Sequence, residues 1–161
     1  ACEKKIKEIK GDINIFPLTH LPVIKDLVVD LSHAFKQLEF IEPWLQNNLD
    51  KPAKNEQPQS LKDRTKIDGL WECILCFCCT TSCVSYWWNE EKYLGPAALL
   101  QAHRWVNDSR DQERKKRLKH IEENSNIHNC HSIMNCANSC PKGLNPAKAI
   151  ADLKKQIATN I

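Results

Sequence analysis

The chain has 161 residues, the size of one domain, with 23 Lys and Arg against 20 Asp and Glu and a formal net charge of +3. This even balance gives no indication of a nucleic-acid partner, and the absence of an apolar run of about 18 residues predicts no transmembrane segment of its own. Seven of the nine cysteines fall in two tight runs, which favours metal thiolates over the disulfide framework of a secreted protein.

The apolar periodicity predicts helices and almost no strand. Residues 1–15 are Lys-rich and are expected to form a mobile N-terminal extension, in which Cys2 has no assignable role. Residues 16–66 are expected to contain one helix, over 27–41, and then a polar linker over 47–66.

Residues 67–161 are expected to form the cysteine-bearing domain. Gly95-Pro96 should open a largely buried helix, and Asn145-Pro146 should open a capped amphipathic helix. A charged helix or loop over 110–123 lies between them, and its basic run over 114–119 is interpreted as a solvated face. The fold class is therefore mostly α, with loops around metal centres.

Both cysteine runs follow one template. The first run has the spacing C-x2-C-x2-C-x3-C and consists of Cys73, Cys76, Cys79 and Cys83. Bacterial two-cluster ferredoxins use this run, with the fourth cysteine bound to the other cluster. The second run, which a proline follows, consists of Cys130, Cys136 and Cys140. Ile133 stands where its middle cysteine belongs.

If the fourth cysteine of each run binds the cluster of the other run, the two sites have unequal numbers of thiolates. The first is expected to hold a 4Fe-4S cluster on four thiolates: Cys73, Cys76, Cys79 and Cys140. The second keeps three thiolates and, with apolar Ile133 at the vacant corner, is expected to hold a 3Fe-4S cluster: Cys83, Cys130 and Cys136. A labile fourth iron open to substrate is an alternative, as are two zinc sites, although zinc sites seldom use such a run. Cys78 is off the spacing and is interpreted as a small buried apolar residue.

Several longer segments carry a family resemblance: 23–28 (VIKDLV), 41–45 (IEPWL), 68–76 (DGLWECILC), 85–88 (SYWW), 92–97 (KYLGPA), 108–111 (DSRD), 130–136 (CHSIMNC) and 140–146 (CPKGLNP). They resemble the iron-sulfur subunit of succinate dehydrogenase, respiratory complex II, and specifically its C-terminal domain. The resemblance implies an α-helical ferredoxin domain, similar to the bacterial two-cluster ferredoxins, with an extended N-terminal arm.

The sequence departs from this family in two ways. Val84 stands where the family usually has a proline, which leaves the shape of the neighbouring pocket open. The C-x4-C-x2-C spacing of the family's 2Fe-2S ferredoxin domain is absent from these 161 residues. We therefore expect a split subunit whose ferredoxin domain is a separate polypeptide, with a processed or truncated chain as the alternative.

The resemblance also implies a function, in the respiratory chain and the tricarboxylic acid cycle. Succinate is oxidised on a flavoprotein subunit, and electrons pass from a 2Fe-2S cluster on another chain through the 4Fe-4S and 3Fe-4S clusters to ubiquinone. Membrane-anchor subunits are the further partners, and the implied location is the matrix side of the mitochondrial inner membrane, as a peripheral subunit. A soluble ferredoxin-like carrier for another dehydrogenase, without a quinone site, is the alternative function, and a zinc-stabilised interaction module is a third.

By the same resemblance, four residues lie beside the quinone: Trp87, Trp88, His131 and Ile133. Trp88 is the best candidate donor, because an indole N–H can hydrogen-bond a quinone carbonyl while its ring packs on the quinone ring. His131 could assist proton delivery, since its charge changes near neutral pH. Without the resemblance, a tryptophan pair is more often core or interface packing. The other five histidines show no ligand spacing.

Overall fold

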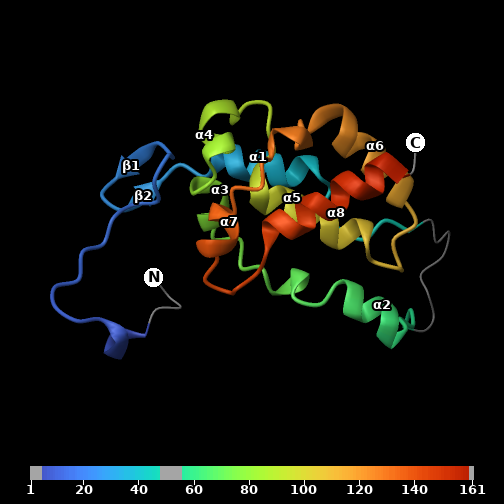
Figure 1. The fold of residues 1–161 in the computed structure, drawn as a ribbon, viewed down its shortest axis with the longest axis horizontal. Coiled ribbons are helices and arrows are strands. Elements are labelled where there is room, and N and C mark those ends of the chain that lie inside the picture. Colours follow the sequence, from blue (N-terminus) through green and yellow to red (C-terminus); the bar gives the residue numbers. More distant parts are fainter. Residues whose placement is uncertain (1–4, 48–55, 160–161) are drawn as a thin grey trace.

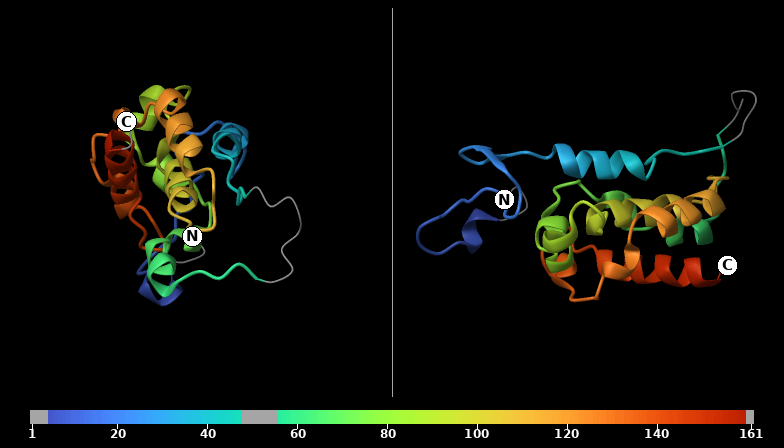
Figure 2. Two further views of the ribbon diagram at one scale, coloured as in Figure 1. Left: turned by 90° about the vertical axis from the view of Figure 1, so that its right-hand side faces the viewer. Right: turned by 90° about the horizontal axis from the view of Figure 1, so that it is seen from above.

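Helices α1 (Ser32–Phe40), α5 (Gly95–Val106), α6 (Arg114–Asn124) and α8 (Pro146–Thr159) form the body of the protein (Figure 1). The computed structural model describes residues 5–47 and 56–159. Helix α5 lies between α1 and α8, and α6 packs against both α5 and α8 (Figure 2). The expectation of a mostly α fold is confirmed by this arrangement.

Shorter elements complete the described chain. Strands β1 and β2 pair antiparallel as a hairpin in the N-terminal arm, which extends from one end of the body (Figure 1). Helices α3, α4 and α7 gather at the same end (Figures 1 and 2). The short elements are η1 (Ile6–Glu8), β1 (Val23–Lys25), β2 (Val28–Val29), α2 (Leu61–Lys66), η2 (Leu70–Glu72), α3 (Cys78–Thr81), α4 (Val84–Asn89), η3 (Ile127–Asn129) and α7 (Asn135–Asn138).

Helix α5 is the buried centre of the fold. Leu99 and Leu100 are almost fully buried, and Leu99 packs in a core shared with apolar residues of α1, α6 and α8. The helix begins tightly against its neighbours: Gly95 has φ 78°, and a Cβ there would lie 2.8 Å from the Tyr86 ring. Thr80 of α3 accepts a hydrogen bond from the Ala97 amide at 3.1 Å, which satisfies one of the free N–H groups at the start of α5. The cysteine-bearing α3 is thereby fixed to the core.

Two predicted boundaries were wrong. The helix expected over 27–41 begins only at Ser32, because residues 23–29 form the β1–β2 hairpin with Asp26 at φ 49° in its turn. Leu27, which was counted in the helix, is 52% exposed. Part of the expected linker is helix α2, whose first turn is capped by the Ser60 hydroxyl. Residues 48–55 of that linker, and Cys2 in the N-terminal extension, lie outside the described residues.

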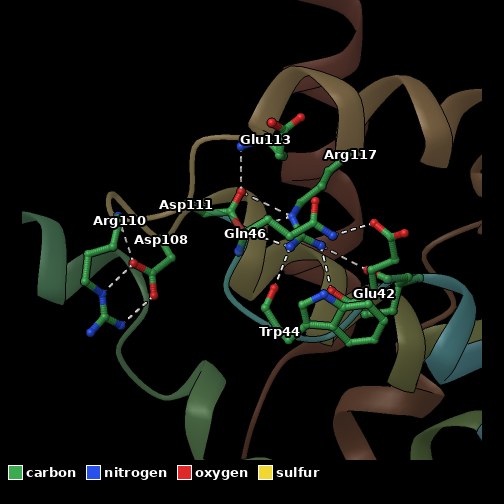
Figure 3. Close-up of polar contacts among 9 residues, drawn as sticks. Glu42, Trp44, Gln46, Asp108, Arg110, Asp111, Glu113 and Arg117 are labelled. Carbon is green, nitrogen blue, oxygen red and sulfur yellow. Dashed lines mark hydrogen bonds and ion pairs between the residues drawn. The ribbon is translucent and has the colours of Figure 1, made fainter. Parts of the chain in front are cut away.

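A buried arginine, Arg117, joins α6 to the segment that follows α1 (Figure 3). Arg117 binds Asp111 at 2.9 Å, with side chains only 4% and 0% exposed. The guanidinium also donates to the carbonyls of Ile41, Glu42 and Trp44, at 3.1, 2.8 and 2.6 Å. The interpretation of residues 114–119 as a solvated face is therefore wrong for Arg117, because its partners come from distant parts of the chain that spacing does not reveal.

A second ion pair orders the loop between α5 and α6 (Figure 3). Arg110 binds the buried Asp108 at 2.7 Å, and the Gln59 amide donates to the same carboxylate at 3.3 Å. The hydrogen bonds from Arg110 lower the pKa of Asp108 more than its burial raises it. Since the folded-state pKa lies below the unfolded value, the pair stabilises the fold at neutral pH, and this stability is lost as the pH falls through the lowered pKa.

Replacement of Arg117 by Met should destabilise the fold, because Asp111 is left as a buried charge without its partner. The expected loss is about 3 to 5 kcal/mol. Chemical denaturation of the purified holoprotein, followed by its visible absorbance and circular dichroism, measures it. Lys115→Met on the exposed side of α6 is the control and should change stability by less than about 0.5 kcal/mol. Equal stability of the two variants would contradict the role given to Arg117.

Candidate iron-sulfur sites

The structure sorts seven cysteines into two cavities. One cavity is lined by Cys73, Cys76, Cys79 and Cys140. The other is lined by Cys83, Cys130 and Cys136. These are the two sets that exchange of the fourth cysteines predicts, and we call them the four-cysteine cavity and the three-cysteine cavity. In the described part of the chain, no three His, Cys, Asp or Glu residues converge on a position for a single metal ion.

The two cysteine loops have the same backbone shape. Leu75 and Phe77, two and four residues after the first cysteine of their run, have φ values of 52° and 57°. Ser132 and Met134 occupy the same places in the second run, with φ values of 56° and 72°. Non-glycine residues adopt this left-handed region at a cost of about 1 to 2 kcal/mol each, so the repeated pattern marks loops held in shape by their surroundings.

Ile133 takes the place of Cys76 in this repeated loop. It follows Cys130 by three residues, as Cys76 follows Cys73, and it borders the three-cysteine cavity while remaining 54% exposed. The apolar side chain offers no ligand atom at that corner. The three-cysteine cavity therefore lacks a fourth thiolate because of one substitution, and not because its loop is built differently.

Short helices carry the fourth cysteine of the first run across to the other cavity. Helix α3 ends before Ser82, and Cys83 then becomes the N-cap of α4, with its carbonyl accepting from the amides of Tyr86 and Trp87. Val84, the residue that replaces the family's proline, is the first residue of α4 and lines the three-cysteine cavity. The first turn of a helix also accepts proline, so the backbone path past Cys83 fits either residue.

Burial raises the pKa of cavity thiols, including those of Cys79 and Cys136. It raises the pKa of Cys79 well above its usual value, and nearby Cys73 and Cys76 add to the effect. Burial likewise raises the pKa of Cys136, with Cys83 and Cys130 as the next causes. Buried neighbouring thiolates repel each other and are poorly solvated, so a positive metal centre must replace their protons when these cysteines act as ligands.

Cys78 lies beside the four-cysteine cavity without lining it. Its side chain is only partly buried, and its thiol lies beside Cys76. Burial, together with a hydrogen bond to Cys76, raises the pKa of Cys78 to about 11. It lines neither cavity, in keeping with its position off the ligand spacing.

The four residues predicted beside the quinone differ in their surroundings. Trp87 uses its indole N–H internally, donating to the Thr81 carbonyl at 2.6 Å, and its ring stacks on His20 of the arm with centroids 3.8 Å apart. Trp88 is 80% exposed, and its indole N–H makes no hydrogen bond to the described residues. His131 and Ile133 line the three-cysteine cavity, whereas the two tryptophans do not. Of these two tryptophans, Trp88 is therefore the one whose indole N–H has no partner among the described residues.

Four of the five remaining histidines, including His20, have structural partners. His103 pairs with Asp152 at 2.7 Å between α5 and α8, and His120 stacks on Phe40. His33 contacts the Glu90 carbonyl at 2.8 Å. Spacing in the sequence gave no signal for the His20 stack on Trp87, nor for Tyr93, which also lines the three-cysteine cavity.

Comparison with known proteins agrees with these sites. Residues 72–145 match the 4Fe-4S dicluster domain, and residues 1–36 match the 2Fe-2S iron-sulfur cluster binding domain. The succinate dehydrogenase iron-sulfur subunit of Paracoccus denitrificans is 53% identical over all 161 residues. The chain is therefore homologous to succinate dehydrogenase iron-sulfur subunits. It spans 62% of the length of that bacterial subunit.

A solved structure shares the fold. A chain of the Mycobacterium smegmatis Sdh1 complex in the apo form superposes with a TM-score of 0.78, over 99% of this chain and 67% of that one. Its sequence identity is 21%, so the likeness shows the fold alone. Together with the dicluster match, it confirms the α-helical two-cluster ferredoxin fold. Within the described residues, no helix has the length and apolar character needed to cross a membrane.

Replacement of Ile133 by Cys should supply the missing thiolate, because the loop around it already has the shape of the loop around Cys76. The oxidised-state paramagnetic signal expected of a 3Fe-4S cluster should disappear, and electron paramagnetic resonance should show a second 4Fe-4S cluster after reduction. Ser132→Cys places a thiol in the same loop but off the ligand spacing, and it should leave the signal in place. An unchanged signal in Ile133→Cys would contradict the equivalence of the two loops.

Proposed function

We propose that the chain is the electron-transfer subunit of a succinate:ubiquinone oxidoreductase and that it holds one 4Fe-4S and one 3Fe-4S cluster. The observation that carries this proposal is the sorting of seven cysteines into a four-cysteine and a three-cysteine cavity. Iron-sulfur clusters are held by cysteine thiolates and supply one-electron transfer. The four-cysteine cavity would hold the 4Fe-4S cluster, and the three-cysteine cavity would hold the 3Fe-4S cluster.

The lining of the cavities fits such clusters. The four-cysteine cavity has no carboxylate or imidazole among its lining residues, and the three-cysteine cavity has one imidazole, that of His131. Two zinc sites would each require four protein ligands in a structural role, and the second cavity is one thiolate short. The match of residues 72–145 to the 4Fe-4S dicluster domain supports the same choice.

The wall between the cavities is thin. Cys79 of the four-cysteine cavity and Cys136 of the three-cysteine cavity belong to one small group of buried residues, together with Ala97 and Ala147. The two thiols are close enough for Cys136 to raise the pKa of Cys79, after the larger effects of burial and of its own cavity's cysteines. Small side chains at this wall keep the two sites near each other, which suits the passage of electrons between them.

Exposed apolar side chains mark the end of the molecule where we place ubiquinone. Trp88, Ile133 and Met134 are 80%, 54% and 39% exposed. They lie on or beside α4 and α7, which share one end of the body (Figures 1 and 2). Apolar surface of this kind is usually covered by a partner or a ligand. Ubiquinone and the apolar faces of membrane-anchor subunits are the occupants that the proposed function supplies.

The other partners follow from the same function. Succinate would be oxidised on a flavoprotein subunit, and the chain would lie at the membrane as a peripheral subunit beside the anchor subunits. The mitochondrial location and the separate 2Fe-2S polypeptide stay predictions. Mass spectrometry of the purified complex tests the prediction of a split subunit, since such a subunit requires a distinct 2Fe-2S polypeptide.

Replacement of Trp88 by Phe should lower ubiquinone reduction, because an aromatic ring is kept while the indole N–H donor is lost. The expected decrease in turnover is about tenfold, the size of one hydrogen bond of about 1.4 kcal/mol. Steady-state ubiquinone reduction by the membrane-bound complex measures it. Trp71→Phe, at a tryptophan that is 49% exposed on η2, is the control and should leave turnover unchanged.

The cluster spectra of Trp88→Phe distinguish two causes of reduced turnover: loss of a quinone contact and loss of the clusters. Normal spectra with reduced turnover support contact between Trp88 and the quinone. Loss of the spectra in Trp88→Phe would instead make this residue structural, and full turnover would remove it from the quinone site.

A further inference from the structure

Tyr93 places a buried hydroxyl at the three-cysteine cavity. The residue is 0% exposed, and no described residue accepts from its hydroxyl with good hydrogen-bond geometry, although the Cys130 thiol is near enough to interact with it as a weak hydrogen-bond partner. It lines the cavity together with Cys83, Cys130 and Cys136. A buried hydroxyl that stays unpaired costs about 1 to 3 kcal/mol, so such a group needs an explanation.

The position of Tyr93 is fixed by its backbone. Its amide donates to the Asn89 carbonyl at 2.8 Å, which holds it to the end of α4. Its carbonyl accepts from the Gln37 side chain at 3.3 Å, which ties it to α1. The ring also belongs to the main apolar core. The hydroxyl is therefore held at the cavity, where burial raises the pKa of Tyr93 and the nearby Cys130 and Cys83 add to the effect.

We propose that the Tyr93 hydroxyl donates a hydrogen bond to a sulfur of the cluster in the three-cysteine cavity and raises its reduction potential. The acceptor is the Cys130 thiolate or a sulfide of the cluster beside it. This inference rests on the proposed function, because it requires a cluster in that cavity. It assigns Tyr93 as a positioning residue that acts on the ligands, and not as a ligand itself.

The physical reason lies in the charge of the reduced state. Reduction adds one electron to the cluster, and the added negative charge is shared with its sulfur atoms. A hydrogen bond to a more negative acceptor is stronger, so a fixed O–H donor stabilises the reduced form more than the oxidised form. Hydrogen bonds to the sulfurs are among the factors that set the potentials of iron-sulfur clusters. The donor therefore makes the cluster a better electron acceptor.

The four-cysteine cavity has no tyrosine hydroxyl among its described lining residues, and Phe77 is the aromatic residue at its wall. Its own donors are different groups: the Lys142 side chain, which lines it, and the Thr80 hydroxyl, which hydrogen-bonds Cys79. Tyr93 thus acts on only one of the two sites. It adds to the effect of the missing fourth thiolate, which already leaves less negative charge around the three-cysteine cavity. Both differences favour electron flow toward that cavity.

Replacement of Tyr93 by Phe in the intact membrane complex tests this proposal. In a redox titration followed by electron paramagnetic resonance, the oxidised-state signal of the 3Fe-4S cluster should titrate at a lower potential. Loss of one hydrogen bond to a charged acceptor should lower the equilibrium constant for reduction about tenfold, a shift of about 59 mV for a one-electron couple. The potential of the 4Fe-4S cluster should stay unchanged.

Tyr86→Phe is the matched control. Tyr86 is a second buried tyrosine, 1% exposed, on α4. Its hydroxyl donates to the Gln37 side chain at 3.0 Å, and the residue does not line the three-cysteine cavity. The control removes the same atom from a nearby place, so its 3Fe-4S potential should match that of the wild type.

The possible outcomes separate this inference from the proposed function. An intact signal with an unchanged potential in Tyr93→Phe would overturn the inference, because the hydroxyl would then bind elsewhere, for example to a buried water. Absence of any 3Fe-4S signal from the wild-type complex would overturn the proposed function instead. If Tyr93→Phe does not assemble a cluster, pulsed electron paramagnetic resonance of the wild-type complex in H2O and in D2O provides the test. The inference requires a proton that is coupled to the 3Fe-4S cluster and that exchanges with solvent. If the two spectra show no such proton, the inference is overturned.

Discussion

Contact between α3 and α7 is the constraint on which both candidate clusters depend. The hydroxyls of Ser82 and Ser139 lie 2.9 Å apart, and Ser139 also donates to the Cys78 carbonyl at 3.3 Å. Each serine follows a short helix at the same position of its own cysteine run. Only when these loops meet can the last cysteine of each run reach the cavity of the other. The exchange of cysteines therefore ties the two sites into one unit.

That unit is attached to a rigid support. Thr80 of α3 caps α5 at the Ala97 amide, and Gly95 allows the start of α5 to approach the Tyr86 ring. At the far side of the body, Arg117 fixes the segment after α1 to α6. The loops need such support because four of their non-glycine residues adopt left-handed backbone conformations. The packing of the helices thus maintains the shape of the ligand loops.

The parts of the fold that sequence could predict are those with strong local signals. Helices α5 and α8 were expected, because each combines apolar periodicity with proline in its first turn. The grouping of the cysteines around two cavities could be predicted because both runs follow the C-x2-C-x2-C-x3-C template, apart from Ile133 in the second, and form the same loop. The start of α1 was misplaced because Leu27 continues the helical period although the β1–β2 hairpin uses it. The burial of Arg117 and the orientation of the Tyr93 hydroxyl depend on residues distant in the chain, so the spacing of residue types along the sequence does not predict them.

The most direct test of the account is electron paramagnetic resonance of the intact complex in its oxidised and reduced states. The account predicts one 3Fe-4S signal in the oxidised state and one 4Fe-4S signal that appears on reduction and belongs to this chain. Two 4Fe-4S signals from the chain, or a colourless protein that contains zinc, would contradict the inequality of the two cavities.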